Sequence, residues 1–255
     1  MSKIGYEVTD SHCHLDFKNF NKDRDEMIQR ALDAGVTTMI NSGIDLKTNK
    51  KTLDFTRNYD FIHATLGLNP NSLDDMSDKD VLATLDHIRE HAGECVAVGE
   101  AGLDHYRCPD QAGRDRQVEV FEKVVNLAQE LDLPLVIHGR QAEQQCFEMV
   151  KHLDKVVFHC YGGTIATMKE AVDRGFYISL ATVICRSAQH QVLARQVPLE
   201  LLLIETDSPF LSPRSGRNEP SYIIDSLNLI AKIKELSPAE VAGATTENAK
   251  RIFKI

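Results

Sequence analysis

Residues 8–16 read Val-Thr-Asp-Ser-His-Cys-His-Leu-Asp, and this stretch decides between the two common arrangements of a parallel sheet. The β-branched and apolar lead-in over residues 6–9 predicts a strand, and that strand runs into His12 and His14. An open doubly wound sheet usually carries a glycine-rich phosphate loop after its first strand. Because this chain has His-Cys-His there, the pattern favours a barrel with chemistry at its strand ends.

Two histidines at i and i+2 of a strand point to the same side. The imidazoles of His12 and His14 should therefore face one point, and Cys13 should face away and bind no metal. Such a pair is half of a site for a divalent metal ion. For an isolated pair, two partly buried histidines hydrogen-bonded at a strand end are the commoner explanation. The metal hypothesis therefore requires further ligands at later strand ends.

The composition is that of an ordinary globular chain. Its 255 residues are 42% hydrophobic and 26% charged, without an apolar run long enough to cross a bilayer or a signal-peptide core at the start. Six scattered cysteines without a C-x-x-C pair predict reduced thiols in a cytoplasmic protein. The formal net charge of -9 argues against nucleic-acid binding driven by overall charge. It does not exclude an enzyme that holds a phosphodiester with metal ions and a few arginines.

Short apolar runs alternate with longer amphipathic ones along the chain. After the first strand, strands are predicted at residues 36–43, 61–70, 95–104, 135–140, 155–163, 176–184 and 201–209. Helices are predicted at residues 21–35, 46–58, 78–93, 113–134, 141–153, 164–175, 187–198 and 220–236, with two short capped helices in 237–253. Eight strand–helix units without a Pro/Gly/Ser-rich linker predict one (β/α)8 TIM barrel over residues 1–255, with extra C-terminal helices.

A barrel of this kind carries its catalytic residues at the carboxyl ends of its strands. Metal-capable side chains lie at five of the eight predicted strand ends, beside buried apolar runs. They are His12, His14, Glu100, His138, His159 and Asp207. An imidazole or carboxylate at such a position is costly to bury without a partner, and shared metal ions remove that cost.

Taken singly, each of these residues has a plainer explanation. His138 or His159 is more often a hydrogen-bonded core histidine, and Glu100 can pair with a nearby arginine such as Arg140. Asp207 before Ser-Pro is typical of an N-cap or a turn. The recurrence at five strand ends favours the metal site. The histidines on predicted helices have charged neighbours and are expected to face solvent: His87, His91, His152 and His190.

Six ligands exceed what one tetrahedral zinc ion needs, whereas two ions that share a carboxylate use them all. The expected arrangement has Glu100 as the bridge, His12, His14 and Asp207 on one ion, and His138 and His159 on the other. In such a pair one ion polarises the scissile oxygen and the other lowers the pKa of the attacking water. Asp207 can also hold or deprotonate that water, so Asp207 and Glu100 are the candidate catalytic residues.

Seven motifs closely resemble the TatD family of metal-dependent deoxyribonucleases, within the amidohydrolase-like TIM barrels. They are DSHCHLD, GEAGLD, LVIHGR, FHCYGG, ETDSPFL, RNEPSYI and TTENAKRIF, in the family's order over nearly the whole chain. The resemblance implies a (β/α)8 fold, one or two divalent ions (Mg2+, Mn2+ or Zn2+) and hydrolysis of DNA, often as a 3'-5' exonuclease. It places the family's ligands on the six residues above, with Glu100 where many relatives in the wider superfamily use a carboxylated lysine.

Two positions depart from the family pattern. Residues 67–70 read Gly-Leu-Asn-Pro, so Asn69 stands where the family usually has a histidine near the substrate. HCYGG replaces the more usual Phe-Ser/Thr-Gly, and its Tyr161 is a candidate for stacking on a base, with packing as the favoured alternative. Arg140 and the segment 217–219 are candidates for phosphate contact or pocket shaping, or else for loop salt bridges. The candidate substrate-binding residues are therefore Asn69, Arg140, Tyr161 and Asn218.

Three functions are compatible with these residues. The first is a metal-dependent deoxyribonuclease on single-stranded DNA, with no membrane and no obligate protein partner. The second is a small-molecule amidohydrolase or esterase on the same barrel, because fold and metals do not fix the substrate. The third is a non-catalytic barrel that binds nucleic acid or a partner, and the retention of all six candidate ligands argues against it.

Overall fold

Residues 5–255 are described by the structure, which is a computed structural model. Over this range eight parallel strands pair in chain order. They are β1 (Val8–Cys13), β2 (Val36–Ser42), β3 (Ile62–Leu68), β4 (Ala97–Asp104), β5 (Leu135–Arg140), β6 (Val156–Phe158), β7 (Tyr177–Ala181) and β8 (Leu202–Glu205). The last strand returns to the first: just beyond β8, the Asp207 amide donates to the His12 carbonyl at 2.9 Å. The sheet is therefore a closed barrel, as predicted.

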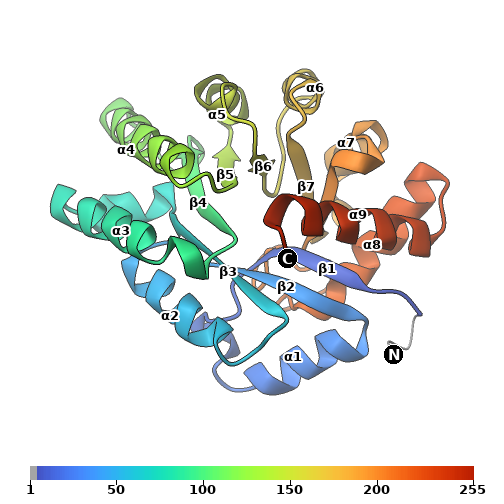
Figure 1. The fold of residues 1–255 in the computed structure, drawn as a ribbon. Helices are drawn as coiled ribbons and strands as arrows, with labels where there is room; N and C mark the ends of the chain where they lie inside the picture. The colour runs from blue at the N-terminus through green and yellow to red at the C-terminus, as the bar shows by residue number, and fades with distance from the viewer. Residues whose placement is uncertain (1–4) are drawn as a thin grey trace.

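Helices surround the strands on the outside (Figure 1). Those between strands are α1 (Arg24–Asp33), α2 (Leu46–Thr56), α3 (Asp78–Glu90), α4 (Gln111–Glu130), α5 (Glu143–Val150), α6 (Ile165–Asp173) and α7 (Ala188–Gln196). Two more, α8 (Ile223–Lys234) and α9 (Pro238–Phe253), follow β8. No helix among residues 5–255 is both long and apolar enough to cross a membrane.

The C-terminal stretch differs from its prediction, because residues 238–253 form one helix and not two short ones. Ser237 begins α9 with a capping box to Glu240. Thr245 does not start a second helix; its hydroxyl donates back to the Val241 carbonyl at 2.9 Å, which keeps the helix continuous.

This helix closes one end of the barrel. Ala249, Ile252 and Phe253 of α9 form one apolar cluster with residues from six strands. The strand residues of the cluster are Ile40, Ala97, Val136, Val157, Tyr177 and Leu203, most of them near the amino ends of their strands. Figure 1 shows α9 beside β1 with the chain end close to the strands. The helix α9 does not cover the opposite mouth, where the carboxyl ends of the strands lie.

Two smaller expectations need correction. Strand β7 ends at Ala181, and residues 182–186 turn into a short 3-10 helix, because the Thr182 hydroxyl bonds to the loop carbonyl of Leu211 at 2.9 Å. His87 does not face solvent but is buried on α3, three residues after Thr84 on the packed side of the helix. His152 is exposed as expected, while His91 and His190 are half-buried.

Candidate metal centre

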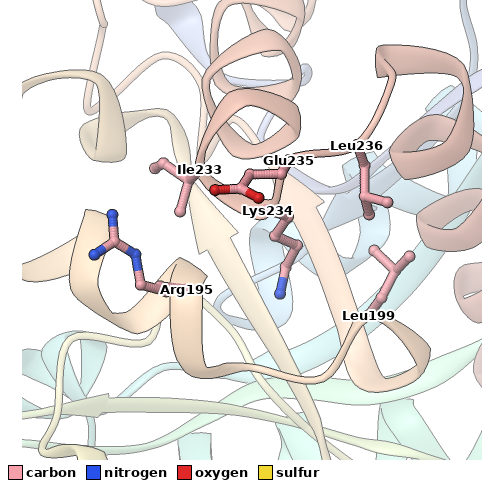
Figure 2. Close-up of a pocket in the computed structure, with 6 residues that line it drawn as sticks. All are labelled: Arg195, Leu199, Ile233, Lys234, Glu235 and Leu236. Carbon is pink, nitrogen blue, oxygen red and sulfur yellow. The ribbon is translucent and has the colours of Figure 1, made fainter.

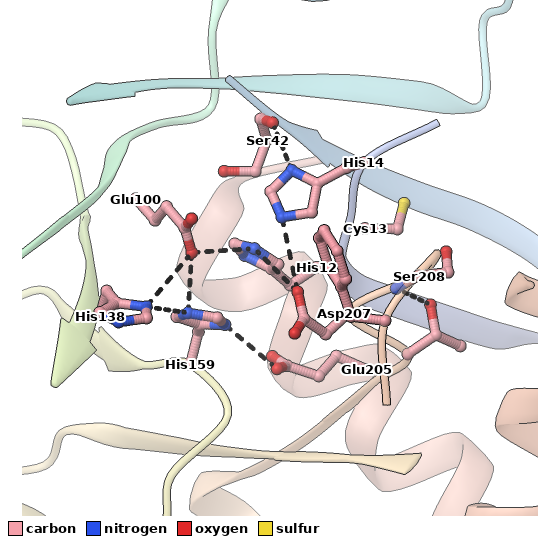
Figure 3. Close-up of polar contacts among 12 residues, drawn as sticks. His12, Cys13, His14, Ser42, Glu100, His138, His159, Glu205, Asp207 and Ser208 are labelled. Atoms are coloured by element: carbon pink, nitrogen blue, oxygen red, sulfur yellow. Dashed lines mark hydrogen bonds and ion pairs between the residues drawn. The ribbon is translucent and has the colours of Figure 1, made fainter. Parts of the chain in front are cut away.

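The six predicted ligands lie in or just after five strands and converge at one mouth of the barrel (Figure 3). His12 lies in β1 and His14 directly after it, while Glu100 lies in β4 and His138 in β5. His159 and Asp207 follow β6 and β8 within two residues. His138 and Asp207 are half-buried, and the other four are buried. The separation of His12 and Asp207 onto opposite faces, which would have excluded the site, does not occur.

Glu100 lies at the centre of the cluster. Its Oε2 atom is 2.8 Å from His159 Nε2, 3.3 Å from His12 Nε2 and 3.9 Å from His138 Nδ1. Its other oxygen, Oε1, accepts a hydrogen bond from Asn69 Nδ2 at 2.5 Å. Burial alone would raise the pKa of Glu100, but the neighbouring His159 and His12 outweigh it and hold the pKa well below its usual range. The carboxylate is therefore ionised and available as a shared ligand.

His14 and Asp207 form one side of the cluster. His14 Nε2 lies 3.5 Å from Asp207 Oδ1, and His12 Nε2 lies 4.0 Å from the same oxygen. Asp207 adopts a left-handed backbone conformation with φ of 53°, which aspartate tolerates better than most residues. Burial alone would lower the pKa of His14, but the hydrogen bond to Asp207 and the charge of Glu100 raise it to about 9. A cation bound here must displace that proton.

His138 and His159 form the other side. His138 Nδ1 lies 3.3 Å from His159 Nε2, so both rings turn a nitrogen toward Glu100. The ring of His159 stacks on His12 with centroids 4.0 Å apart, which links the two sides. Cys13 takes no part, because its thiol points away toward the Ile40 carbonyl at 3.3 Å, as expected (Figure 3).

Three of the imidazoles are held from behind by oxygen atoms that the sequence reasoning did not assign. The Ser42 carbonyl lies 2.8 Å from His14 Nδ1, Asp104 Oδ2 lies 2.9 Å from His138 Nε2, and Glu205 Oε1 lies 3.2 Å from His159 Nδ1. Such contacts fix which nitrogen of each ring faces a metal. Asp104 and Glu205 lie inside the motifs GEAGLD and ETDSPFL. The sequence therefore indicated that both residues are near the site, but it did not indicate that they hold the histidines.

The residues fit one or two divalent cations on the chemistry of their atoms. Three overlapping groups each bring their ligand atoms within 4.8 Å of one another: His12 with His14 and Glu100, His12 with His159 and Asp207, and Glu100 with His138 and His159. Within residues 5–255, His12 Nε2 and Glu100 Oε2 are buried and approach each other to 3.3 Å, yet neither atom makes a hydrogen bond of proper geometry. Buried polar atoms are rarely left so, and a cation between them would satisfy both. Imidazole and carboxylate ligands suit Zn2+ and Mn2+.

Two of the four candidate substrate-binding residues contact a candidate ligand or lie exposed, and the other two pack inside the protein. Asn69 contacts Glu100, and Arg140 is exposed with its guanidinium carbon 3.8 Å from the ring centroid of Tyr106. Tyr161 is 1% exposed and donates its hydroxyl to the Thr164 carbonyl, so it has the packing role and offers no face to a base.

Asn218 is fully buried, and its amide donates to the carbonyls of Thr206 and Phe210 at 2.8 and 2.6 Å. It therefore fixes the loop that carries Asp207 and does not reach substrate.

Arg217 and Glu219, the neighbours of Asn218 in this loop, form salt bridges. These salt bridges were the alternative to phosphate contact for residues 217–219. Arg217 pairs with both carboxylate oxygens of Asp23 at 2.7 Å, and Arg30 pairs with Glu219 at 2.7 Å. Arg217 is thus engaged with α1's cap and not free for a phosphate.

A separate hollow of about 590 Å³ lies where α7 and α8 end (Figure 2). It is lined by Arg195, Leu199, Ile233, Lys234, Glu235 and Leu236, and it includes none of the predicted site residues. Lys234 Nζ donates to the Val197 carbonyl at 2.5 Å and ties α8 to the end of α7. The hollow is a seam between helices and is distinct from the candidate metal centre.

A closed parallel barrel with four imidazoles and two carboxylates at its carboxyl mouth is the architecture of an amidohydrolase-like, metal-dependent hydrolase. Residues 9–254 match the family described as TatD related DNase. The chain is 37% identical over 249 residues to an uncharacterized metal-dependent hydrolase of Methanocaldococcus jannaschii, covering 97% of each. It is 34% identical over 269 residues to the 3'-5' ssDNA/RNA exonuclease TatD of Cronobacter sakazakii, covering 99% of this chain and 97% of that protein.

Among solved structures, the crystal structure of YjjV, a TatD homologue from Escherichia coli, aligns with a TM-score of 0.89. The two are 26% identical, and the alignment covers 97% of this chain and 98% of that one. The chain therefore belongs to the TatD-related family of metal-dependent hydrolases.

Proposed function

We propose that this protein is a metal-dependent deoxyribonuclease that hydrolyses phosphodiester bonds of single-stranded DNA from the 3' end. The observation that carries the proposal is the position of Glu100 Oε2, within 3.9 Å of three imidazole nitrogens from three different strands. A carboxylate shared in this way suits a pair of cations, and paired cations suit phosphodiester cleavage. The exonuclease TatD of Cronobacter sakazakii, which is named for ssDNA and RNA, supports the substrate class.

The proposed ligands are the six residues at the carboxyl mouth, for one or two ions of Mg2+, Mn2+ or Zn2+. His12, His14 and Asp207 would hold one ion, His138 and His159 the other, and Glu100 would bridge. Cations held by these residues would supply the charge that polarises the scissile phosphoryl group and lowers the pKa of the attacking water, so that it can lose a proton near neutral pH.

Asp207 is the proposed group that orients the water and accepts its proton. Its side chain is 14% exposed, whereas Glu100 is 5% exposed and surrounded by imidazoles. A carboxylate that reaches solvent can exchange a proton with it during turnover, and a buried one exchanges poorly. Glu100 is therefore proposed to hold the ions, and Asp207 to move the proton.

Asn69 favours a second candidate, a small-molecule amidohydrolase or esterase. It stands where relatives usually carry a histidine near the substrate, and its amide is engaged with Glu100. The metal chemistry would be the same for a carboxylic ester or an amide, so the substrate alone separates the two candidates.

The deciding experiment uses metal-free protein and single-stranded DNA labelled at either the 5' or the 3' end. Addition of Mg2+, Mn2+ or Zn2+ should restore stepwise shortening from the 3' end, and excess chelator should abolish it. Glu100→Ala should lower kcat at least about 1,000-fold, on the scale of about 4 kcal/mol of lost transition-state stabilisation.

Glu122→Ala, which changes an exposed glutamate on α4, should leave the rate unchanged and serves as the matched control. Failure to cut DNA or RNA with any of the three ions, together with turnover of a lactone, ester or amide, would replace the nuclease with the second candidate.

All six cysteines are free thiols, which supports a cytoplasmic location for the reaction.

A further inference from the structure

Among residues 5–255 the structure leaves two aromatic side chains exposed, Tyr106 at 58% and Phe210 at 48%. Apolar side chains exposed singly are ordinary on a protein surface. Both of these rings, however, belong to loops that begin at the ligand-bearing strand ends. It is their position beside the candidate ligands, and not their exposure, that calls for an explanation.

Phe210 lies three residues beyond Asp207 on the loop after β8. Its ring centroid is 6.2 Å from that of His14, and its amide donates to the Asp207 carbonyl at 2.9 Å. Asn218 holds the Phe210 carbonyl at 2.6 Å, while Phe17 supports the ring edge-on with centroids 6.1 Å apart. The exposed ring thus sits on a fixed backbone directly beside one group of candidate ligands.

Tyr106 lies two residues beyond Asp104, the carboxylate that holds His138. The guanidinium of Arg140 covers one face of its ring at 3.8 Å, and Arg140 itself follows His138 by two residues on β5. The tyrosine ring remains largely exposed despite this contact. Ring and guanidinium together make a flat, positively charged surface beside the other group of candidate ligands.

The two rings lie on opposite rims of the mouth. Phe210 belongs to the β8–β1 junction and Tyr106 to the β4–β5 junction, which are four strands apart in a closed ring of eight. The ligand cluster spans the space between them, from His14 through Glu100 to His138. A chain of nucleotides that crosses the mouth with one phosphate on the cluster would carry neighbouring bases toward both rims.

We propose that Phe210 and Tyr106 are base-stacking subsites on either side of the scissile phosphate, with Arg140 supplying a backing charge to the second. The proposal rests on the nuclease function above. Every base has a stackable face, so these subsites would tolerate any sequence. A duplex keeps its bases stacked on one another, and only an unpaired strand can offer them to the two rings. The subsites therefore select single strands.

The test compares steady-state kinetics of Phe210→Ala and Tyr106→Ala on a short single-stranded DNA and on the same strand with abasic sites flanking the cleaved bond. On the intact strand each variant should raise KM about tenfold, which corresponds to about 1.4 kcal/mol, with kcat changed less than about threefold. On the abasic strand the variants should match the wild type. Phe210→Tyr and Tyr106→Phe keep a ring and should keep the wild-type KM.

Leu82→Ala removes an exposed apolar side chain on the outer helix α3 and should change nothing. An unchanged KM for both alanine variants on the intact strand would overturn the proposal, and so would an equal rise on intact and abasic strands.

If the wild-type protein cuts no strand, the nuclease function fails separately. Fluorescence anisotropy of a labelled strand with Mn2+ then decides the inference: about tenfold weaker binding by the variants supports it, and equal binding or none refutes it.

Discussion

The carboxylate of Asp104 lies 2.9 Å from Nε2 of His138, and this contact turns Nδ1 of the same ring toward Glu100. Without an acceptor behind it, the imidazole of His138 could present either nitrogen to the mouth. A charged acceptor selects one orientation and makes the facing nitrogen a stronger ligand. The same logic applies to Glu205 behind His159.

The first prediction concerns Asp104→Asn. The substitution preserves the volume but removes the charge behind His138, so metal affinity should fall about 10- to 100-fold. Competition with a chromophoric chelator measures the affinity directly and does not require a substrate. Asp115→Asn, at an exposed site on α4, is the matched control and should retain wild-type affinity. Equal affinities for both variants would show that the contact does not tune the site.

The second prediction concerns removal of the metal. A cation that binds only the folded protein stabilises it by about 2.7 kcal/mol at a free concentration of 100 times its Kd. For a chain of this size the melting temperature should rise about 5 to 10 °C when Mn2+ or Zn2+ is added to chelated protein. Glu100→Gln should show little or none of this rise, because it removes the shared charge. A rise of the same size in that variant would locate the bound ion elsewhere.

The third prediction concerns Phe253, which is 2% exposed in the cluster that closes the barrel end. Phe253→Ala should reduce the free energy of unfolding by about 3 to 5 kcal/mol, and Phe253→Leu by much less. Urea denaturation measures both. Because α9 lies at the end away from the candidate ligands, kcat of the folded fraction should stay at the wild-type value. A large fall in kcat for Phe253→Leu would contradict this separation of stability from activity.

The fourth prediction concerns acid stability and Glu219. Burial alone would raise the pKa of Glu219, but its hydrogen bonds from Arg30 and Ser221 lower it below the usual 4.5. The folded protein then binds this proton more weakly than the unfolded chain does. The interaction therefore stabilises the fold at pH values above the unfolded-state pKa, and this stabilisation is lost as the pH falls through the lower folded-state pKa.

Glu219→Gln should thus be less stable than the wild type at pH 7, and the difference should shrink between pH 5 and 3. Arg30 is half-exposed, so solvent screens its ion pair with Glu219. The difference in the free energy of unfolding at pH 7 should therefore be on the order of 1 kcal/mol. Thermal unfolding across this pH range measures it. A gap that widens on acidification would contradict the assignment.

The strands and most helices followed from local pattern, because apolar runs and helix caps act over a few residues. Residues 135–140 form β5 with the predicted bounds, and Ser77 begins α3 with a capping box. The single helix α9 could not be read the same way. Its continuity depends on burial of Thr245 and on the apolar cluster around Phe253, which involves six distant strands.

The candidate ligands were predictable as a set, since they recur beside buried apolar runs at five predicted strand ends, although each taken singly has a plainer explanation. Their supporting groups were less so. An aspartate in GEAGLD has the same local surroundings whether it holds His138 or faces solvent. The predicted substrate-binding roles of Tyr161 and Asn218 do not agree with their burial. A polar or aromatic residue beside a ligand can pack inward as readily as it can face the substrate.

The sequence by itself determined the order of eight strand–helix units and the two histidines at 12 and 14 that face one side of the first strand. Those features depend on the alternation of side chains along a strand, which is a local property. Only the tertiary structure decided that Glu100 lies between His12 and His159, and that Tyr106 and Phe210 stand on opposite rims. These relationships join residues up to about 150 positions apart, and closure of the barrel is what brings them together.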